Sequence, residues 1–182
     1  MMDYAKGEFP LIKLHGSMNW AHEIRNFSPQ NLGSNEEMIS EIIDRTPSLD
    51  IDNESYRIVH EDPFARQRIP LFPALAIPVE NKSRYECPRD HVKTLEDCLP
   101  HVERLLIIGW KAAENTLLKT MAKSVQKKTR VMIVSSNHES ALDVIHKLTM
   151  PMEESNVKPE YYTTNGGFSN FIFSKELDDF LR

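Results

Sequence analysis

The architecture of this chain is set between residues 105 and 134, which read LLIIGWKAAENTLLKTMAKSVQKKTRVMIV. Residues 105–108 are an unbroken apolar run that ends at Gly109, as is typical of a strand buried on both faces of a parallel sheet. Residues 116–128 place their apolar side chains on one helical face, and residues 131–134 form a second apolar run. The stretch therefore predicts a strand, a helix and a strand in succession.

The same alternation continues to the end of the chain. The tetrapeptide 136–139 has the form of a capping box, with Ser136 as the cap of a helix whose apolar stripe runs from 141 to 148. A proline-containing linker over 151–159, a strand over 161–164 and a closing helix over about 169–181 follow. This βαβαβα order predicts an α/β fold with a Rossmann-like parallel sheet, right-handed crossovers and helices on both faces.

The N-terminal part of the chain is less regular. Residues 9–14 predict a short buried strand that ends in a turn. Residues 21–68 predict an inserted segment, irregular and mostly helical, whose one clear helix spans about 36–44. Ser34 or Asn35 is the expected cap of that helix.

Prolines shape the middle of the chain. Five of them between residues 63 and 88 favour an extended loop with one short strand at 75–77, because proline disfavours helix for the residue before it. A helix is predicted over 91–102, with Asp90 as its cap and Pro100 close to its end.

Composition narrows the class of protein. The 182 residues, of which 40% are hydrophobic, can bury one core of ordinary size, so we expect a single domain over 1–182. A net charge of -5 and a pI near 5.8 argue against a nucleic-acid protein. Cys87 and Cys98 are too few for a disulfide framework or an all-cysteine zinc site, and no metal is expected.

The longest apolar run is far below the roughly 20 residues that span a bilayer. We expect a soluble, cytoplasmic protein with no membrane partner.

Small and polar residues follow each predicted strand. They are His15-Gly16-Ser17, Gly109-Trp110-Lys111, Ser135-Ser136-Asn137 and Asn165-Gly166-Gly167-Phe168. Ligands of an open parallel sheet bind outside the carboxyl ends of its strands, so these groups predict a cleft of nucleotide size. Glycine and serine also make the ordinary turns of any α/β protein, and that interpretation stays open.

Four segments of the chain resemble sirtuin-like proteins, especially the bacterial ones linked to anti-phage defence. Residues 11–20, LIKLHGSMNW, resemble their LHG-S-x-N/D-W segment, and residues 70–82 resemble a proline-rich stretch that ends in lysine. Residues 105–114 resemble their strand that ends in glycine and an aromatic residue, and the GGF segment is the fourth match. The segments occur in the family's order and cover most of the chain from Phe9 onward. An unrelated α/β protein with an accidental LHGS segment is the competing interpretation.

The resemblance implies NAD as the cofactor and a role for each matched residue. His15 matches the catalytic histidine, which accepts a proton from a hydroxyl of the nicotinamide ribose or from water, a task that suits neutral imidazole at cytosolic pH. Without the resemblance, a histidine at a strand end is more often a structural turn residue, and we expect the other six histidines to be structural. The implied contacts with the adenosine part of NAD come from Gly109, Trp110, Ser135, Asn137, Gly167 and Phe168.

Three of the implied residues have alternatives. Lys111 stands where many relatives carry serine, and its ammonium either pairs with a phosphate or points into solvent. Ser136, between Ser135 and Asn137, also has a structural use in the expected capping box. Phe168 either closes over the adenine or belongs to the core.

The sequence contains no counterpart of the family's opening strand, glycine-rich turn and helix, which hold the pyrophosphate. The paired CxxC motifs of the deacylases are also missing. We therefore expect the C-terminal portion of a sirtuin-like domain, either a piece of a longer protein or a shortened relative. It would hydrolyse NAD to nicotinamide and ADP-ribose only when completed by an N-terminal half, and otherwise act as an inactive nucleotide-binding or protein-interaction module. An unpaired sheet edge predicts a homo-oligomer or a partner chain.

Overall fold

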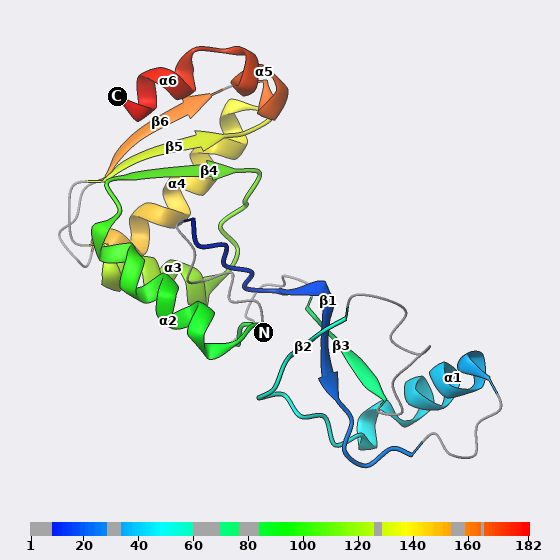
Figure 1. The fold of residues 1–182 in the computed structure, drawn as a ribbon. Helices are drawn as coiled ribbons and strands as arrows, with labels where there is room; N and C mark the ends of the chain where they lie inside the picture. Colours follow the sequence, from blue (N-terminus) through cyan, green and yellow to red (C-terminus); the bar gives the residue numbers. More distant parts are fainter. Residues whose placement is uncertain are drawn as a thin grey trace. The chain divides into compact units, whose positions relative to one another are not determined.

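The structure is a computed structural model, which describes residues 9–28, 34–59, 70–76, 84–125, 129–153, 159–164 and 166–182. These residues form two compact units (Figure 1). Unit 1 consists of residues 1–77 and 85–94, and unit 2 of residues 78–84 and 95–182. The single sirtuin-like domain expected over 1–182, with 21–68 as its insertion, stays a prediction.

Unit 2 is built on a parallel sheet. Its strands are β4 (Arg104–Ile108), β5 (Arg130–Val134) and β6 (Glu160–Thr164), in the order β4-β5-β6. The register is unbroken, with Ile108 paired to Val134 and Val134 to Thr164. All three carboxyl ends therefore lie at one edge of the sheet. The strands predicted from their apolar runs are confirmed to within one residue at each end.

Helices cover both faces of this sheet (Figure 1). The bounds of the helical elements are α2 Arg89–Cys98, a 3-10 turn at Leu99–His101, α3 Asn115–Ser124, α4 His138–Glu153, α5 Gly167–Phe173 and α6 Glu176–Leu181. Val131 and Ile133 pack with α3 and α4, whereas Met132 and Val134 pack with α5 and α6. This alternation follows from the two-residue period of a strand. The α/β fold with a Rossmann-like parallel sheet flanked by helices is thus confirmed.

Two predicted helix boundaries at the C-terminal end are wrong. Helix α4 continues through Pro151 to Glu153, into the residues predicted as a linker. The closing helix predicted over 169–181 is two helices, α5 and α6. Ser174 has an extended backbone and its N–H donates to the carbonyl oxygens of Asn170 and Phe171, which ends α5 before the acidic first turn of α6. The remainder of the expected linker, 154–158, lies outside the described residues.

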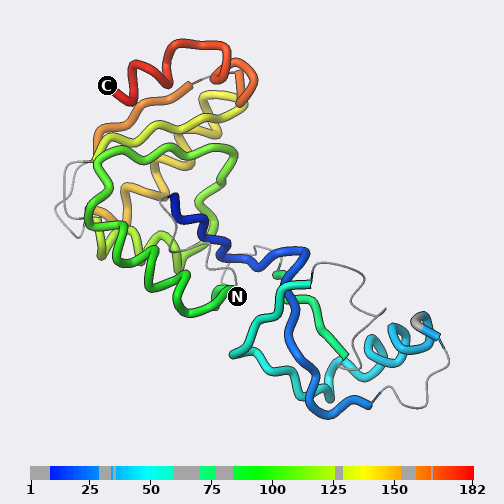
Figure 2. The backbone as a smooth tube through the Cα atoms, viewed as in Figure 1, coloured from blue at the N-terminus to red at the C-terminus, as the bar shows by residue number. Residues whose placement is uncertain are grey.

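Unit 1 holds a small antiparallel sheet. Its strands are β1 (Gly16–Glu23), β2 (Arg57–Ile58) and β3 (Leu71–Leu75), and β1 is central. Pro73 lies in β3, an edge strand of this sheet, where the missing N–H is tolerated. The tube in Figure 2 shows β1 passing between β2 and β3.

Two strand predictions in unit 1 are wrong. Residues 9–14 form no strand, and Phe9 is 86% exposed. The strand begins instead at Gly16, inside the predicted turn, because the side chains that unit 1 buries are further along, at Trp20, Ala21 and His22. The strand expected at 75–77 ends at Leu75 and begins at Leu71. Ile77 lies outside the described residues.

Helix α1 (Asn35–Arg45) confirms the one clear helix of segment 21–68. Ser34 is its cap, since the Oγ atom of Ser34 accepts a hydrogen bond from the N–H of Glu37. A 3-10 turn follows at Thr46–Ser48. Segment 21–68 also supplies the end of β1 and the whole of β2, so it takes part in the sheet of unit 1. Residues 60–69 lie outside the described residues.

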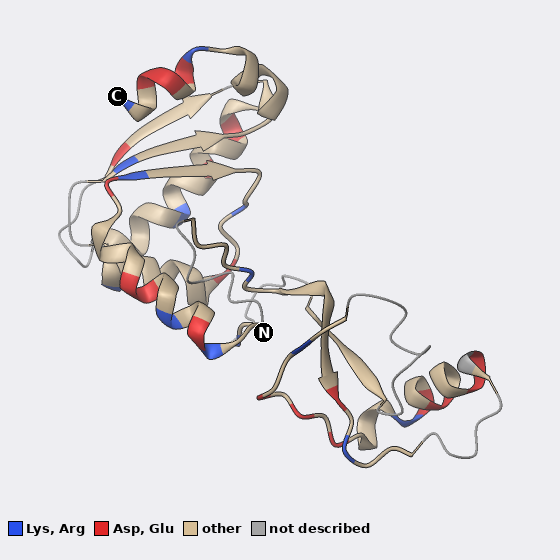
Figure 3. Ribbon diagram, viewed as in Figure 1, with Lys and Arg blue, Asp and Glu red and all other residues tan. Residues whose placement is uncertain are grey.

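Charges of both signs occur along the helices of each unit, and acidic and basic positions follow one another along α2 (Figure 3). None of the helices among the described residues combines the length and the apolar character that a membrane-spanning helix needs.

The core of unit 2 can be tested with two leucines of α4. Leu148 is 1% exposed within the cluster that joins α3, α4 and the sheet, whereas Leu142 on the same helix is 48% exposed. We expect Leu148→Ala to lower the free energy of unfolding by about 2–5 kcal/mol, because it removes a buried side chain and leaves a cavity. Leu142→Ala is the matched control and should change it by about 0.5 kcal/mol or less. Urea unfolding followed by circular dichroism gives both values, and equal losses would contradict the assigned core.

Candidate functional site

A cavity of about 480 Å³ lies in unit 2 at the carboxyl ends of β4 and β5. Its wall combines the ends of these strands, the loops that follow them, the first turns of α4 and the start of α5. Seven of the residues singled out from the sequence line it: Gly109, Trp110, Lys111, Ser135, Ser136, Gly167 and Phe168. The volume falls within the range of about 300–1,000 Å³ typical of small-molecule sites.

Gly109 brings the backbone to the edge of this cavity. Its φ of +66° lies in the region that favours glycine, and a Cβ atom placed there would meet nothing within 4 Å. The N–H of Gly109 donates to the carbonyl oxygen of Val134 at 3.3 Å, so the loop after β4 continues the pairing with β5. The open space beside Gly109 is therefore available to a ligand.

The loop after β4 also presents an indole ring. Trp110 lines the cavity, and its Nε1–H donates to Oε1 of Glu114 at 3.3 Å. Glu114 stands directly before α3, so the start of that helix orients the ring. Lys111 lines the same wall and is exposed.

The loop after β5 is tied to α5. The N–H of Gly167 donates to the carbonyl oxygen of Ser135 at 2.9 Å, and Gly167 has a φ of +74°. Phe168 is 52% exposed and lines the cavity, so the alternative that it belongs to the core is wrong. The ring therefore offers an apolar face to whatever occupies the cavity.

The residue predicted to cap α4 is wrong. Asn137, and not Ser136, caps the helix, because Oδ1 of Asn137 accepts a hydrogen bond from the N–H of Ser140 at 2.8 Å. Serine and asparagine are both good caps. Which of the two neighbours, Ser136 or Asn137, caps the helix depends on the backbone geometry, and a sequence does not show that geometry. Ser136 lines the cavity instead, and the residues that line it do not include Asn137.

Sequence reasoning missed the contribution of α4. Ser140 and Asp143 lie in the first two turns of α4, and both line the cavity. Their spacing of three places both on one helical face, which is the signal that could have found them. Asp143 accepts a 2.7 Å hydrogen bond at Oδ2 from Nζ of Lys147, and Lys147 also donates to the carbonyl oxygen of Lys111 at 3.3 Å.

The predicted catalytic residue, His15, lies in unit 1. It is partly exposed and pairs through its backbone with Glu86, and its carbonyl oxygen accepts a hydrogen bond from the N–H of Ala76. The next residue, Gly16, has a φ of +81°, and a Cβ atom there would overlap the carbonyl oxygen of Ala74. His15 is thus held by backbone contacts within unit 1, and the cavity belongs to unit 2.

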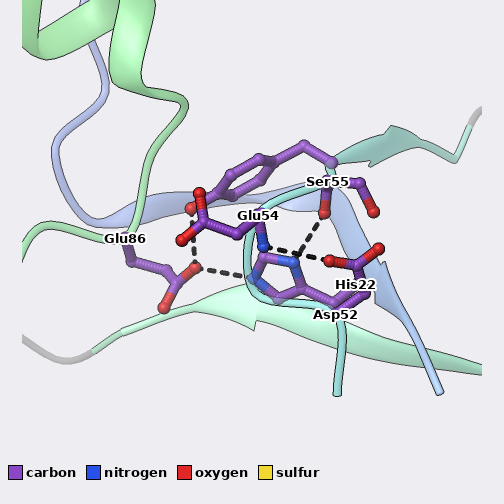
Figure 4. A network of polar contacts seen from close by, with 6 residues as sticks. His22, Asp52, Glu54, Ser55 and Glu86 are labelled. Carbon is purple, nitrogen blue, oxygen red and sulfur yellow. Dashed lines mark hydrogen bonds and ion pairs between the residues drawn. The ribbon is translucent and has the colours of Figure 1, made fainter. Parts of the chain in front are cut away.

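Unit 1 contains a polar network that the sequence did not reveal (Figure 4). His22 is 2% exposed, with Nδ1 at 2.8 Å from the carbonyl oxygen of Ser55 and Nε2 at 2.8 Å from Oε1 of Glu86. Tyr56 donates from its hydroxyl to the same Oε1 at 3.2 Å. The residues that contact His22 come from distant parts of the chain, so a single sequence does not indicate these contacts.

The geometry fixes one hydrogen of His22. A carbonyl oxygen only accepts hydrogen bonds, so Nδ1 carries a hydrogen and donates it to Ser55. The 2.8 Å contact between Nε2 and Oε1 of Glu86 ties the central strand β1 to residue 86.

The loop that contains Asp52 and Glu54 borders this network. A hydrogen bond from the Ser55 side chain holds the pKa of Asp52 below its usual value, against an opposing effect of burial, and the N–H of Glu54 and the Arg25 guanidinium add to the lowering. Asp52 pairs with Arg25 at 2.8 Å. Over the described ranges of the chain, no group of three His, Cys, Asp or Glu side chains is placed to hold a metal ion.

None of the protein-family models, curated proteins or solved structures compared with this chain matches it.

The His22 pair can be tested by removing its acidic partner. Glu86→Ala takes away the group that contacts the buried Nε2 of His22, so we expect a loss of about 1–3 kcal/mol in the free energy of unfolding. Glu54→Ala is the matched control, because Glu54 forms an exposed ion pair with Arg89 and should contribute about 1 kcal/mol or less. Both values come from urea unfolding. A Glu86 variant as stable as the Glu54 variant would show that the pair does not stabilise the unit.

The two cysteines should differ in reactivity. Burial, with a smaller contribution from the negative charge of Glu86, raises the pKa of the Cys87 thiol to about 11, whereas Cys98 is exposed. At pH 8 only about one Cys87 in a thousand is then a thiolate, the reactive form. We expect iodoacetamide to alkylate Cys98 and spare Cys87 in the folded protein, as read by mass spectrometry. In urea both should react at similar rates, and fast alkylation of Cys87 in the folded protein would contradict its burial.

Proposed function

We propose that this chain is an NAD-binding, sirtuin-like domain whose unit 2 takes the adenosine part of NAD or ADP-ribose into the cavity at the ends of β4 and β5. The observation that carries the proposal is the convergence of Gly109, Ser135 and Gly167, from three separate turns, on one cavity. Open parallel sheets bind nucleotides at this edge.

The lining supplies each kind of contact that a nucleotide needs. The open space at Gly109 lets the backbone approach the ligand closely. Trp110 and Phe168 offer aromatic faces for a base, and the hydroxyls of Ser135 and Ser136 are suited to a ribose. Lys111 is the cation of the lining and suits a phosphate, which favours the first of its two interpretations.

The sirtuin-like part of the proposal rests on the sequence motifs. They support descent from a cytoplasmic NAD hydrolase of the type linked to anti-phage defence, with His15 as the base that accepts a proton when nicotinamide is released and ADP-ribose is formed. His15 is not among the residues that line the cavity, which favours a second candidate, a nucleotide-binding or protein-interaction module without catalysis. Both candidates share the cavity and differ in whether nicotinamide is released.

A partner is also part of the proposal. Strand β4 is at the edge of the parallel sheet among the described strands, although its sequence, Arg-Leu-Leu-Ile-Ile, is that of a strand buried on both faces. An unpaired edge of this kind invites a further strand. We propose that a second copy or a partner chain covers it.

Calorimetry with ADP-ribose tests the binding site. Ser140 lines the cavity and is exposed, so Ser140→Phe should fill the space and weaken affinity at least about tenfold, or about 1.4 kcal/mol. His146→Phe places the same side chain on an exposed position of α4 outside the lining, and it should bind as the unchanged protein does. Absence of binding to the unchanged protein, or equal affinity of the two variants, would contradict the proposal.

Mixing the chain with NAD, alone and with a supplied N-terminal half, separates the two candidates. Nicotinamide release that His15→Ala abolishes would establish the hydrolase, and ADP-ribose binding without release from the completed protein would establish the inactive module.

A further inference from the structure

Two separate segments of unit 1 hold the backbone at His15. The carbonyl oxygen of His15 accepts a hydrogen bond from the N–H of Ala76 at 3.0 Å, and the carbonyl oxygen of Leu14 accepts one from the N–H of Glu86 at 2.9 Å. His15 and Glu86 form an isolated parallel bridge outside the strands of the sheet. A bridge of one residue pair offers few hydrogen bonds, and each adds little because water competes for the same groups. The position of residue 86 therefore depends on its other contacts.

The side chain of Glu86 supplies such contacts (Figure 4). Its Oε1 atom lies 2.8 Å from Nε2 of His22 and accepts a 3.2 Å hydrogen bond from the Tyr56 hydroxyl. His22 is 2% exposed, and its Nδ1–H donates to the carbonyl oxygen of Ser55, so the ring is held at both nitrogens. The carboxylate of Glu86 is thus bound to a fixed, buried ring of β1.

An irregularity in β1 explains how Glu86 reaches both places. From Gly16 to Ala21 the strand advances five positions, while its partner strand β3 advances two, from Leu75 to Pro73. A bulge of this kind bends a strand and interrupts the regular pairing. Glu86 contacts the chain on both sides of the irregular stretch, with its backbone before Gly16 and with its side chain after Ala21.

We infer that Glu86 is the residue that positions His15, because its side chain, bound to His22, fixes the backbone against which His15 is held. This inference rests on the proposed role of His15 as a base and adds the residue that places it. Glu86 acts through the backbone and does not itself take the proton. A base must lie within hydrogen-bond reach of the proton it accepts, and a displacement of about 1 Å can cost about a hundredfold in rate.

Backbone order parameters of the 15N-labelled chain test the positioning without a ligand, since they report motion within the folded state and not its stability. We expect the amides of His15 and Ala76 to have values near about 0.85 in the unchanged chain and about 0.6 or below in Glu86→Ala. The amide of Ile24, which donates to the carbonyl oxygen of Pro70 directly after β1, should keep its value.

Three further variants make this measurement specific. Glu86→Gln should restore the order, because an amide can accept a hydrogen bond from Nε2 of His22 or donate one to it. Glu86→Asp keeps the charge and shortens the side chain, so it should lower the order partly, and it serves if Glu86→Ala does not fold. Glu54→Ala, at a side chain 60% exposed in an ion pair with Arg89, is the control and should change none of the three amides.

Nicotinamide release by the chain completed with an N-terminal half reads the same change in function. We expect Glu86→Ala to lower kcat per folded molecule at least about tenfold, with KM within about twofold because the proposed adenosine site lies in unit 2. Glu86→Gln should recover most of kcat. Urea unfolding gives the folded fraction, so a role in stability alone would leave kcat per folded molecule unchanged.

The outcomes separate this inference from the proposed function. Lower order at His15 and Ala76 in Glu86→Ala, restored by Glu86→Gln and accompanied by the loss of kcat, supports it. Unchanged order at these amides, or an equal loss at Ile24, would overturn the positioning, as would an unchanged kcat, and would leave the hydrolase standing. Absence of release from the unchanged completed protein would overturn the hydrolase and, with it, this role of Glu86.

Discussion

The unbroken parallel pairing of β4, β5 and β6 is the constraint on which the cavity depends. Because Ile108, Val134 and Thr164 stand in register, the turns after these strands leave the sheet at one edge. A slip of one residue in β5 would turn its side chains to the opposite faces and break both clusters that hold the helices. The apolar sequence of the strands determines the register, and the register places Gly109 and Ser135 beside each other.

The sequence predicts most of unit 2, because its signals are local. The apolar runs at 105–108 and 131–134 need no distant partner to be recognised as buried strands. The strand expected at 9–14 fails for the opposite reason. An apolar segment whose first residues stay exposed, Phe9 above all, looks the same in sequence as one that is buried. The antiparallel partners of β1 lie far along the chain, and a single sequence does not show which apolar segment they cover.

The sequence predicts the place of the cavity at the strand ends, but it does not predict the acidic residue that lines it. Residues at strand ends follow from a general rule for parallel sheets, and Gly109 and Phe168 were found by it. Asp143 was missed because it lies on a helix, where an acidic side chain is normally a solvated one. The pair of His22 and Glu86 was missed because 64 positions separate the two residues. Long-range polar contacts of this kind depend on the folded arrangement and leave no local pattern.

The two units divide the residues of the proposed chemistry. Unit 1 carries His15 on a backbone held by Ala76 and Glu86, and unit 2 carries the residues proposed to bind the adenosine part. Amide chemical shifts of the 15N-labelled chain titrated with ADP-ribose test the central claim most directly. The account predicts that the amides of Gly109, Ser135 and Gly167 shift together with one saturation curve. Shifts that leave these three amides unmoved, or no shifts at saturating ADP-ribose, would contradict it.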